Sequence, residues 1–240
     1  KVFMGQAAEN IEGADLIVYT AAIMSDNPEL IAAKQSNAVC VERSELLGLV
    51  TSWYKNAVCV SGTHGKTTTS SMLTHIYLAE NVDISTVIGG KLKAIGGSGR
   101  AGKSETMVCE ACEFSNTFLK LYPDTAIILN QQSMDKFENM VKPGGLLIYD
   151  PNGITRHPER KDINICSIEA AEESAIMGNT KAFNMIVFGA FLKKKPILTM
   201  ENVIRGIKKS IPERHHHLIP MNEQAIMVGM EKVKDIQTIQ

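Results

Sequence analysis

The chain has 240 residues, of which 44% are hydrophobic and 21% charged, with 25 basic and 26 acidic side chains. This length and apolar share suffice for one large domain or two small ones with a buried core. The net charge of −1 argues against a nucleic-acid-binding surface, because backbone-driven binding needs a basic excess. No apolar run approaches the roughly 18 residues of a membrane span, and no leader is recognisable, so we expect a soluble, cytoplasmic chain without a membrane partner.

The first expected elements alternate between strands and helices. The chain begins at Lys1 in what looks like the middle of a domain. Residues 15–20 form a short β-rich apolar run of the kind buried in a parallel sheet, and Pro28 suits the first turn of a helix. Residues 57–60 are expected to be a strand and residues 67–80 a helix. The apolar stripe of that helix is interpreted as core packing.

The same alternation continues along the rest of the chain. Residues 105–109 and 125–129 are expected strands, and the glycine-rich stretch 88–102 is expected to be a loop able to wrap a ligand. Further on, the patterns predict a helix at 134–141, a turn at 142–145, a strand at 146–149, and helices from Ile168, Ala182, Met200 and Met221. Such alternation indicates βαβ units, so the predicted fold class is α/β with a mostly parallel sheet.

The strongest chemical signal is a glycine loop between the strand at 57–60 and the helix at 67–80. Glycines let a backbone turn sharply and bring its N–H groups against phosphate oxygens, and a helix N-terminus adds donors and a positive dipole end. Lys66 can reach the β- and γ-phosphates of ATP, and the Thr67 hydroxyl can ligate Mg²⁺. Val60 stands where the strict P-loop pattern has glycine, so the loop is a shorter variant. The residues expected to bind the nucleotide are Gly62, Thr63, His64, Gly65, Lys66, Thr67 and Thr68.

A phosphoryl-transfer site also needs a carboxylate that holds its metal. Glu110 and Glu113 follow the expected strand at 105–109, at the edge where ligand sites of α/β sheets cluster. Either carboxylate is a candidate metal ligand, and two solvated loop acids are the alternative. Cys109 and Cys112 lack a second pair at metal-binding spacing, so we interpret them as reduced thiols at a strand end.

These motifs resemble the Mur ligase family. Residues 62–69 are similar to the ATP loop of that family. The segments similar to the end of its UDP-binding domain are 8–15, 19–23, 26–29 and 41–45, and those similar to its central ATPase domain are 88–91, 94–97 and 110–114. Within the family, the similarity is greatest to members that join L-alanine to UDP-N-acetylmuramate.

The resemblance implies amide formation driven by ATP. In the family, ATP phosphorylates the muramate carboxylate and the amine of L-alanine attacks the acyl phosphate. By matching position, Lys66 would stabilise the transferring phosphoryl charge, and Thr67 and Glu110 would hold Mg²⁺. His64 and Glu113 would line the substrate side and complete the catalytic set. A loop-packing imidazole is the alternative for His64.

Beyond residue 130 the sequence resembles a different family. A Mur ligase would continue with an Asp-His pair, whereas this chain continues with Gln131 and Gln132, and we expect no counterpart of the remaining ligase domains. The segments 131–137, 141–150, 181–185 and 188–192 are similar to the gamma subunit of 2-oxoacid:ferredoxin oxidoreductases. That resemblance implies an α/β assembly module whose partners are oxidoreductase subunits.

We therefore expect a chimera in three parts: the end of a UDP-binding domain at 1–55, a partial ATPase domain at 56–130, and a partial gamma-like domain at 131–240. Three functions stay open, namely an incomplete ligase, an assembly module, and a fold without activity. The ligase is favoured because only that half has identifiable chemistry. Asn184, polar within an apolar helix, is interpreted as a satisfied packing amide. His215–His217 are interpreted as an exposed helix start, since three consecutive imidazoles point in different directions.

Overall fold

The computed structural model describes residues 1–63, 65–111, 120–196, 198–211 and 213–236, and its centre is one eight-stranded sheet. The strands from β9 to β4 run parallel, and β10 and β5 run antiparallel at the two edges. This confirms the α/β class with a mostly parallel sheet. The strand order is β10 (Lys234–Asp235), β9 (Asn164–Ser167), β8 (Leu146–Tyr149), β7 (Thr125–Ile128), β3 (Asn56–Ser61), β6 (Thr106–Glu110), β4 (Ser85–Leu92), β5 (Gly97–Arg100).

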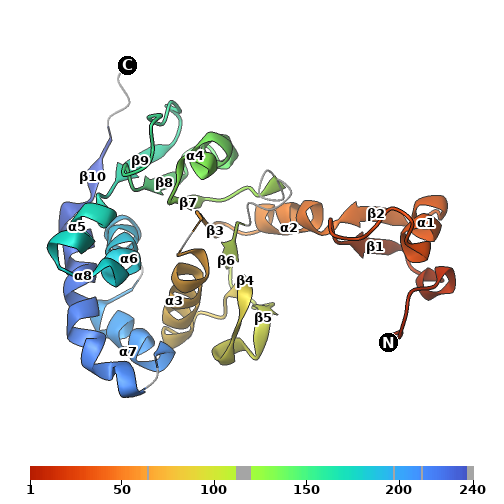
Figure 1. Ribbon diagram of the computed structural model, residues 1–240, viewed down its shortest axis with the longest axis horizontal. Helices are drawn as coiled ribbons and strands as arrows, with labels where there is room; N and C mark the ends of the chain where they lie inside the picture. Colours follow the sequence, from red (N-terminus) through yellow and green to blue (C-terminus); the bar gives the residue numbers. More distant parts are fainter. Residues whose placement is uncertain (64, 112–119, 197, 212, 237–240) are drawn as a thin grey trace.

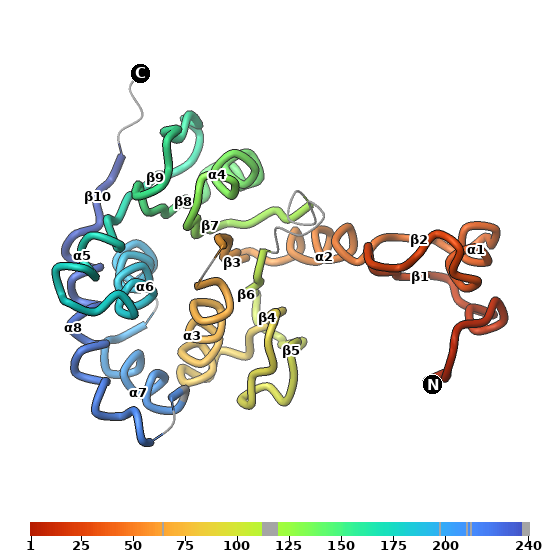
Figure 2. Tube along the Cα trace, viewed as in Figure 1, coloured from red at the N-terminus to blue at the C-terminus, as the bar shows by residue number. Residues whose placement is uncertain are grey.

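A small N-terminal lobe projects from this sheet on helix α2 (Arg43–Ser52), as the ribbon and the trace show (Figures 1 and 2). The lobe contains a 3-10 helix η1 (Ala8–Ile11), a parallel strand pair β1 (Leu16–Tyr19) and β2 (Val39–Glu42), and helix α1 (Pro28–Gln35). As expected, Pro28 lies in the first turn of α1, and Asn27 Oδ1 accepts a hydrogen bond from the Leu30 amide at 3.1 Å. The sequence analysis predicted β1 and α1 but neither β2 nor α2.

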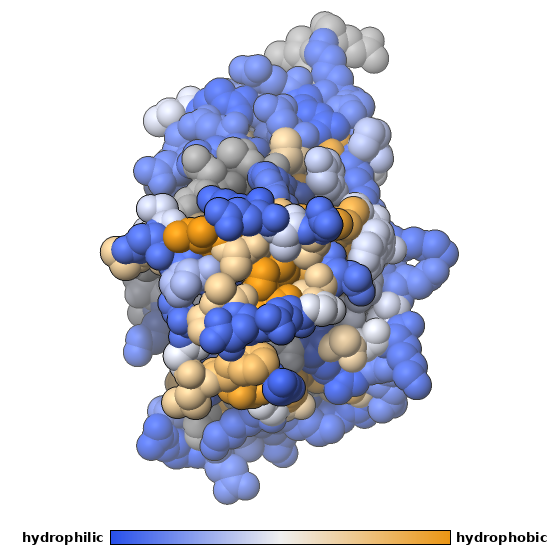
Figure 3. Space-filling model, turned by 90° about the vertical axis from the view of Figure 1, so that its right-hand side faces the viewer, coloured by the Kyte–Doolittle hydropathy of each residue, from blue (hydrophilic) through white to orange (hydrophobic). Residues whose placement is uncertain are grey.

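The surface of the lobe keeps apolar side chains in contact with solvent. Leu16 and Val39, which face each other across the β1–β2 pair, are 49% and 61% exposed. Figure 3, which views the molecule from the side of the lobe, shows apolar surface surrounded by hydrophilic residues. A two-stranded sheet is marginal by itself. Helix α2 contacts both strands of the lobe and connects it to the large sheet.

Helices cover both faces of the large sheet. Val58 and Val60 of β3 face one hydrophobic cluster and Cys59 between them faces the other, as the period of two in a strand requires. On the first face lie α3 (Lys66–Ala79), α5 (Ala170–Ile176), α6 (Phe183–Lys194), α7 (Met200–Ser210) and α8 (Ile219–Lys232); on the second face lie α2 and α4 (Gln131–Phe137). Each of the helices predicted from the sequence is confirmed, with shifted ends.

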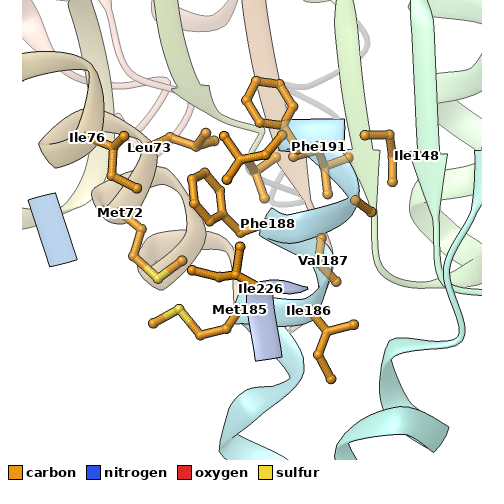
Figure 4. Packing of buried hydrophobic residues seen from close by; sticks show 14 of the residues in the cluster. Met72, Leu73, Ile76, Ile148, Met185, Ile186, Val187, Phe188, Phe191 and Ile226 are labelled. Atoms are coloured by element: carbon orange, nitrogen blue, oxygen red, sulfur yellow. The ribbon is translucent and has the colours of Figure 1, made fainter. Parts of the chain in front are cut away.

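Helix α6 is the centre of the first layer and is buried along most of its length. Figure 4 shows its Phe188 and Phe191 between Leu73 of α3 and Ile148 of β8. Glycine permits the closest contact, because a Cβ on Gly229 of α8 would lie 1.9 Å from the carbonyl oxygen of Ile186. Helices α6 and α8 therefore pack tightly on each other, and α7 packs on α3, where a Cβ on Gly206 would lie 2.8 Å from Ile76 Cγ1.

The glycine-rich stretch 88–102 is not a loop, and that expectation is wrong. It forms most of a β4–β5 hairpin, with Val87 opposite Gly99 and a short 3-10 turn η2 (Lys93–Ile95). Gly96 has a φ of +69°, a conformation that favours glycine. Gly97 and Gly99 lie on the exposed edge strand β5, where hydrogen bonds to β4 rather than side-chain packing define the strand.

The remaining expected features have mixed outcomes. The turn at 142–145 is present, with the Gly145 amide donating to the Lys142 carbonyl at 2.8 Å, and two further 3-10 turns are η4 (Glu138–Met140) and η5 (Thr180–Ala182). His215–His217 lie in a 3-10 turn, η6 (Glu213–Leu218), rather than in the start of an α-helix. Cys109 is a free, buried thiol at the end of β6, as expected, and Cys112 lies outside the described residues.

Candidate functional site

The glycine loop lies between the end of β3 at Ser61 and the start of α3 at Lys66. Gly62 has a φ of +151° and Gly65 a φ of +84°, so both positions favour glycine. A Cβ on Gly62 would come within 2.6 Å of the Leu129 Cβ. The loop thus needs its glycines for backbone conformation and for close approach to the segment that follows β7.

Lys66, the first residue of α3, turns back over the loop, and its Nζ donates a hydrogen bond to the carbonyl oxygen of Gly62. The ammonium therefore lies inside the curve of the loop. The helix itself starts with the Thr69 amide donating to the Gly65 carbonyl at 2.9 Å. The earlier amide groups of the helix are free of that ladder, as at every helix N-terminus.

Thr67 and Glu110 meet beside the loop. Parallel pairing of β3 with β6 sets Val60 opposite Glu110, and Thr67 Oγ1 donates to Glu110 Oε2 at 3.1 Å. The other carboxylate oxygen, Oε1, is shielded from solvent and has no hydrogen-bond partner among the described residues. Hydroxyl and carboxylate oxygens are ligands that Mg²⁺ prefers, and an unpaired shielded oxygen needs a partner, so this pair fits a hard divalent cation.

Two glycines of β4 make room for this pair. A Cβ on Gly89 would lie 2.8 Å from Glu110 Oε2, and one on Gly90 would lie 3.2 Å from Thr67 Cγ2. From the sequence, Gly89 and Gly90 belong only to a family-like motif and to the glycine-rich stretch expected to be a loop. Their role in admitting the Glu110 carboxylate depends on the pairing of β4 with β6, which is not visible in local sequence.

The structure brings most of the expected nucleotide-binding residues to one place. Gly62, Thr63, Gly65, Lys66, Thr67 and Thr68 form the loop and the first turn of α3, with Thr63, Thr67 and Thr68 exposed. His64 and Glu113, expected on the substrate side, lie outside the described residues. Within the described part of the chain, no group of three or more His, Cys, Asp and Glu side chains could hold a metal ion. The histidines at 215–217 therefore do not form a metal site of this kind.

Residues after β7 support the loop, and the sequence analysis missed them. Asn130 Nδ2 donates to Thr63 Oγ1 at 2.6 Å, while its Oδ1 accepts from the Ser133 amide at 2.8 Å and caps α4. The Leu129 amide donates to the Ser61 carbonyl at 3.1 Å. An asparagine between a strand and a helix was the only local signal of this support.

Asn184 of α6 also lies at the loop, and its interpretation as a satisfied packing amide is wrong. Its Oδ1 is shielded from solvent and accepts no hydrogen bond from any residue that the structure describes. A Cβ on Gly65 would lie 2.5 Å from this oxygen. The carboxamide therefore sits against the N-terminus of α3 instead of bonding within its own helix layer.

Asp150, at the carboxyl end of β8, has a structural role. Its two carboxylate oxygens accept from the amides of Asn152 at 2.8 Å and Ala171 at 2.9 Å. Burial raises the pKa of this carboxyl, although the two amide bonds oppose that shift. The contacts fix the chain on both sides of the β8 end.

No helix among the described residues is long and apolar enough to cross a membrane.

The fold and the loop together define a mixed α/β protein with a strand–glycine loop–helix unit at the carboxyl end of its sheet. The family model described as pyruvate ferredoxin/flavodoxin oxidoreductase matches residues 61–232, so the chain belongs to that family. The model of the Mur ligase family, catalytic domain, matches residues 1–54 of the same chain. The chain is thus a chimera that carries sequence of both families.

Curated relatives show similarity to ligases over a longer part of the chain than the ligase family model does. A UDP-N-acetylmuramate–L-alanine ligase of Clostridium beijerinckii is 51% identical over 133 residues, 55% of this chain and 29% of that protein. The enzyme of the same name from Clostridium botulinum strain Hall is 48% identical over 251 residues, 98% of this chain and 54% of that protein. This second alignment continues beyond residue 130, where the sequence analysis expected no ligase counterpart. The chain spans about half or less of the length of these relatives.

Solved structures agree with the fold. The crystal structure of UDP-N-acetylmuramate–alanine ligase from Thermotoga maritima has a TM-score of 0.55 at 23% identity and covers 62% of this chain and 38% of that one. At this identity the likeness establishes the α/β architecture alone. The oxidoreductase family model begins at residue 61, ahead of the join expected near residue 130.

Proposed function

We propose that the chain binds Mg-ATP at residues 62–68 and carries the phosphate end of the site of an ATP-dependent ligase that joins L-alanine to UDP-N-acetylmuramate. The observation that carries this proposal is the Thr67–Glu110 pair at the start of α3, with its unpaired carboxylate oxygen. The curated relatives with that name support the substrates. The division into parts at 1–55, 56–130 and 131–240 belongs to the same proposal.

Each described residue of the site has a proposed role that follows from its chemistry. Lys66 exchanges the Gly62 carbonyl for phosphate oxygens and stabilises the charge that develops on the transferring phosphoryl group. Thr67 and Glu110 hold Mg²⁺, which when bound neutralises phosphate charge. His64 and Glu113 are proposed to line the substrate side. The chain spans about half of its relatives. We expect turnover only together with the substrate-positioning parts of those relatives that lie outside this match, since positioning is worth about 7–11 kcal/mol of barrier.

Binding of Mg-ATP is tested by titration calorimetry and by thermal melting with the parent chain and Lys66→Ala. A ligand at one hundred times its Kd stabilises a native state by about 2.7 kcal/mol, so the parent should melt several degrees higher with Mg-ATP. Lys66→Ala should lose this shift, and Lys34→Ala, an exposed lysine of α1, should keep it. A cooperative melt of the parent without any response to Mg-ATP would contradict the proposal.

A second candidate function rests on the oxidoreductase family model, which matches most of the chain. In this case the chain is a gamma-like assembly module that docks to subunits of a thiamine-diphosphate oxidoreductase. Purified partner subunits mixed with the chain should give a complex on size-exclusion chromatography. A complex that forms with Lys66→Ala as well as with the parent would separate this function from nucleotide binding.

A further inference from the structure

Helix α6 begins beside the glycine loop although it comes more than a hundred residues later in the chain. Its sequence, Phe183 to Lys194, is apolar up to Leu192 except for Asn184 in the first turn. The side chain of the preceding residue, Ala182, provides no cap. Asn184 is not part of the hydrophobic cluster in which the apolar residues of α6 are buried.

The position of Asn184 relative to the loop is specific. Its carboxamide oxygen lies 2.5 Å from where a Cβ on Gly65 would be, so a side chain at that position would displace the Asn184 carboxamide. Gly65 is the residue just before α3, and the free amides at a helix N-terminus are suited to bind a phosphate. A side chain in contact with Gly65 therefore lies next to the expected position of the phosphate groups.

The hydrogen bonding of Asn184 is incomplete. Its Oδ1 is shielded from solvent and accepts no bond from the described residues, an arrangement that buried polar atoms rarely keep unless a partner arrives. A carboxamide has two N–H donors on Nδ2 as well as the acceptor, and half a turn about its last bond exchanges the two ends. The same side chain can thus present N–H donors to an anion at the loop.

We infer that Asn184 is a nucleotide-binding residue: its carboxamide donates a hydrogen bond to a phosphate oxygen of the nucleotide held at residues 62–68. The inference rests on the proposed function of that loop and extends it, because the ligand contact comes from a helix more than a hundred residues further along the chain. The phosphate site is then built from residues on both sides of the join expected near residue 130, with Lys66 and Thr67 before it and Asn184 after it, all within the stretch that the oxidoreductase family model matches.

The experiment compares Mg-ATP, Mg-ADP and AMP binding by titration calorimetry in the parent chain and in Asn184→Asp. The aspartate keeps the shape of the side chain but replaces a donor with a negative charge, so repulsion grows with the phosphate charge. We expect ATP affinity to fall about tenfold or more, the scale of a hydrogen bond to a charged group, with a smaller loss for ADP and the smallest for AMP. Asn37→Asp, the same charge change at an exposed residue of the lobe, should leave all three affinities unchanged.

Further variants exclude a purely structural role. Asn184→Leu keeps the branched shape of the side chain and removes both donors; it should weaken ATP binding while the ligand-free protein melts at or above the parent's temperature. If Asn184→Asp does not fold, the smaller Asn184→Ser gives the same decision on ATP affinity. Parent-like ATP affinity in Asn184→Asp, or an equal loss for all three nucleotides, overturns the inference while Lys66→Ala still reports on the loop. A parent chain that binds no Mg-ATP overturns the proposed function and this inference together.

Discussion

The hydroxyl oxygen of Ser61 lies 2.8 Å from the hydroxyl oxygen of Ser133, and both residues are 1% exposed. Ser61 ends the strand that leads into the glycine loop, and Ser133 lies in α4, just after the expected join of the two families. A buried hydroxyl pair of this kind fixes the end of one segment against the start of the other. The loop is therefore positioned by residues of both segments.

A double-mutant cycle should measure this link. Ser61→Ala, Ser133→Ala and the double variant are compared by urea unfolding, and we expect a coupling of about 0.5–1.5 kcal/mol, the usual net value of one hydrogen bond. Ser174, a buried serine of α5 that bonds the Ala171 carbonyl, provides the control pair with Ser61. The two control changes should be additive; equal coupling in both pairs would contradict a direct bond.

Gly229→Ala should destabilise the fold by about 1–3 kcal/mol or more, because the added methyl group overlaps a backbone carbonyl that cannot rotate away. The Ile186 carbonyl oxygen lies 1.9 Å from the position of that Cβ. Gly97→Ala is the matched control, since no atom lies within 4 Å of its Cβ position. Urea unfolding of both variants checks the expectation, and similar midpoints would show that α6 and α8 can separate at little cost.

The stability of the protein should fall as the pH drops below about 6.5, and His75 of α3 should contribute to this loss. Burial lowers the pKa of His75, since the charged imidazolium is poorly solvated there. The unfolded chain then takes up the proton first as the pH falls, so stability present above the unfolded pKa is lost towards the folded pKa. His75→Gln should melt with a smaller difference between pH 7.5 and pH 5.5 than the parent, whereas His217→Gln, at an exposed position, should match the parent.

Removal of magnesium should weaken ATP binding in the parent more than in Glu110→Gln. The carboxylate is the only charged group of the Thr67–Glu110 pair, and the amide that replaces it is a poorer ligand for Mg²⁺. Calorimetric titrations with ATP, with Mg²⁺ and with excess chelator, give the ratio of affinities. Glu105→Gln, an exposed residue just before β6, is the control, and a parent-like ratio in Glu110→Gln would exclude it as a metal ligand.

The sequence predicted the strand–loop–helix unit well because its signals are local. The apolar strand, the glycines and the polar start of α3 lie within about 25 residues. The hairpin at 85–100 was missed because its second strand, β5, is rich in glycine. Backbone hydrogen bonds to β4 form that strand, and they leave no side-chain pattern in the sequence. Strand β2 was missed because its apolar run, Val39 to Val41, is shorter than that of β1 and ends at the charged Glu42.

The candidate site was predicted in part for the same physical reason. Lys66, Thr67 and Glu110 follow from the ends of strands and the start of a helix, which local pattern reveals. Asn130 and Asn184 reach the loop from 67 and more residues away, so only the folded chain brings them there. Hydrogen-bond partners at such separation leave no periodic or motif signal in a single sequence.

Strand β7 lies where the expected join of the two family-like segments meets the large sheet. It pairs with β3 on one side and with β8 on the other, so the expected join runs through the middle of a sheet and not through a linker. Truncation near residue 130 would remove strands β8, β9 and β10 and also the helix layer around α6 that covers the sheet. The parts of the sheet before and after residue 130 are therefore expected to unfold together.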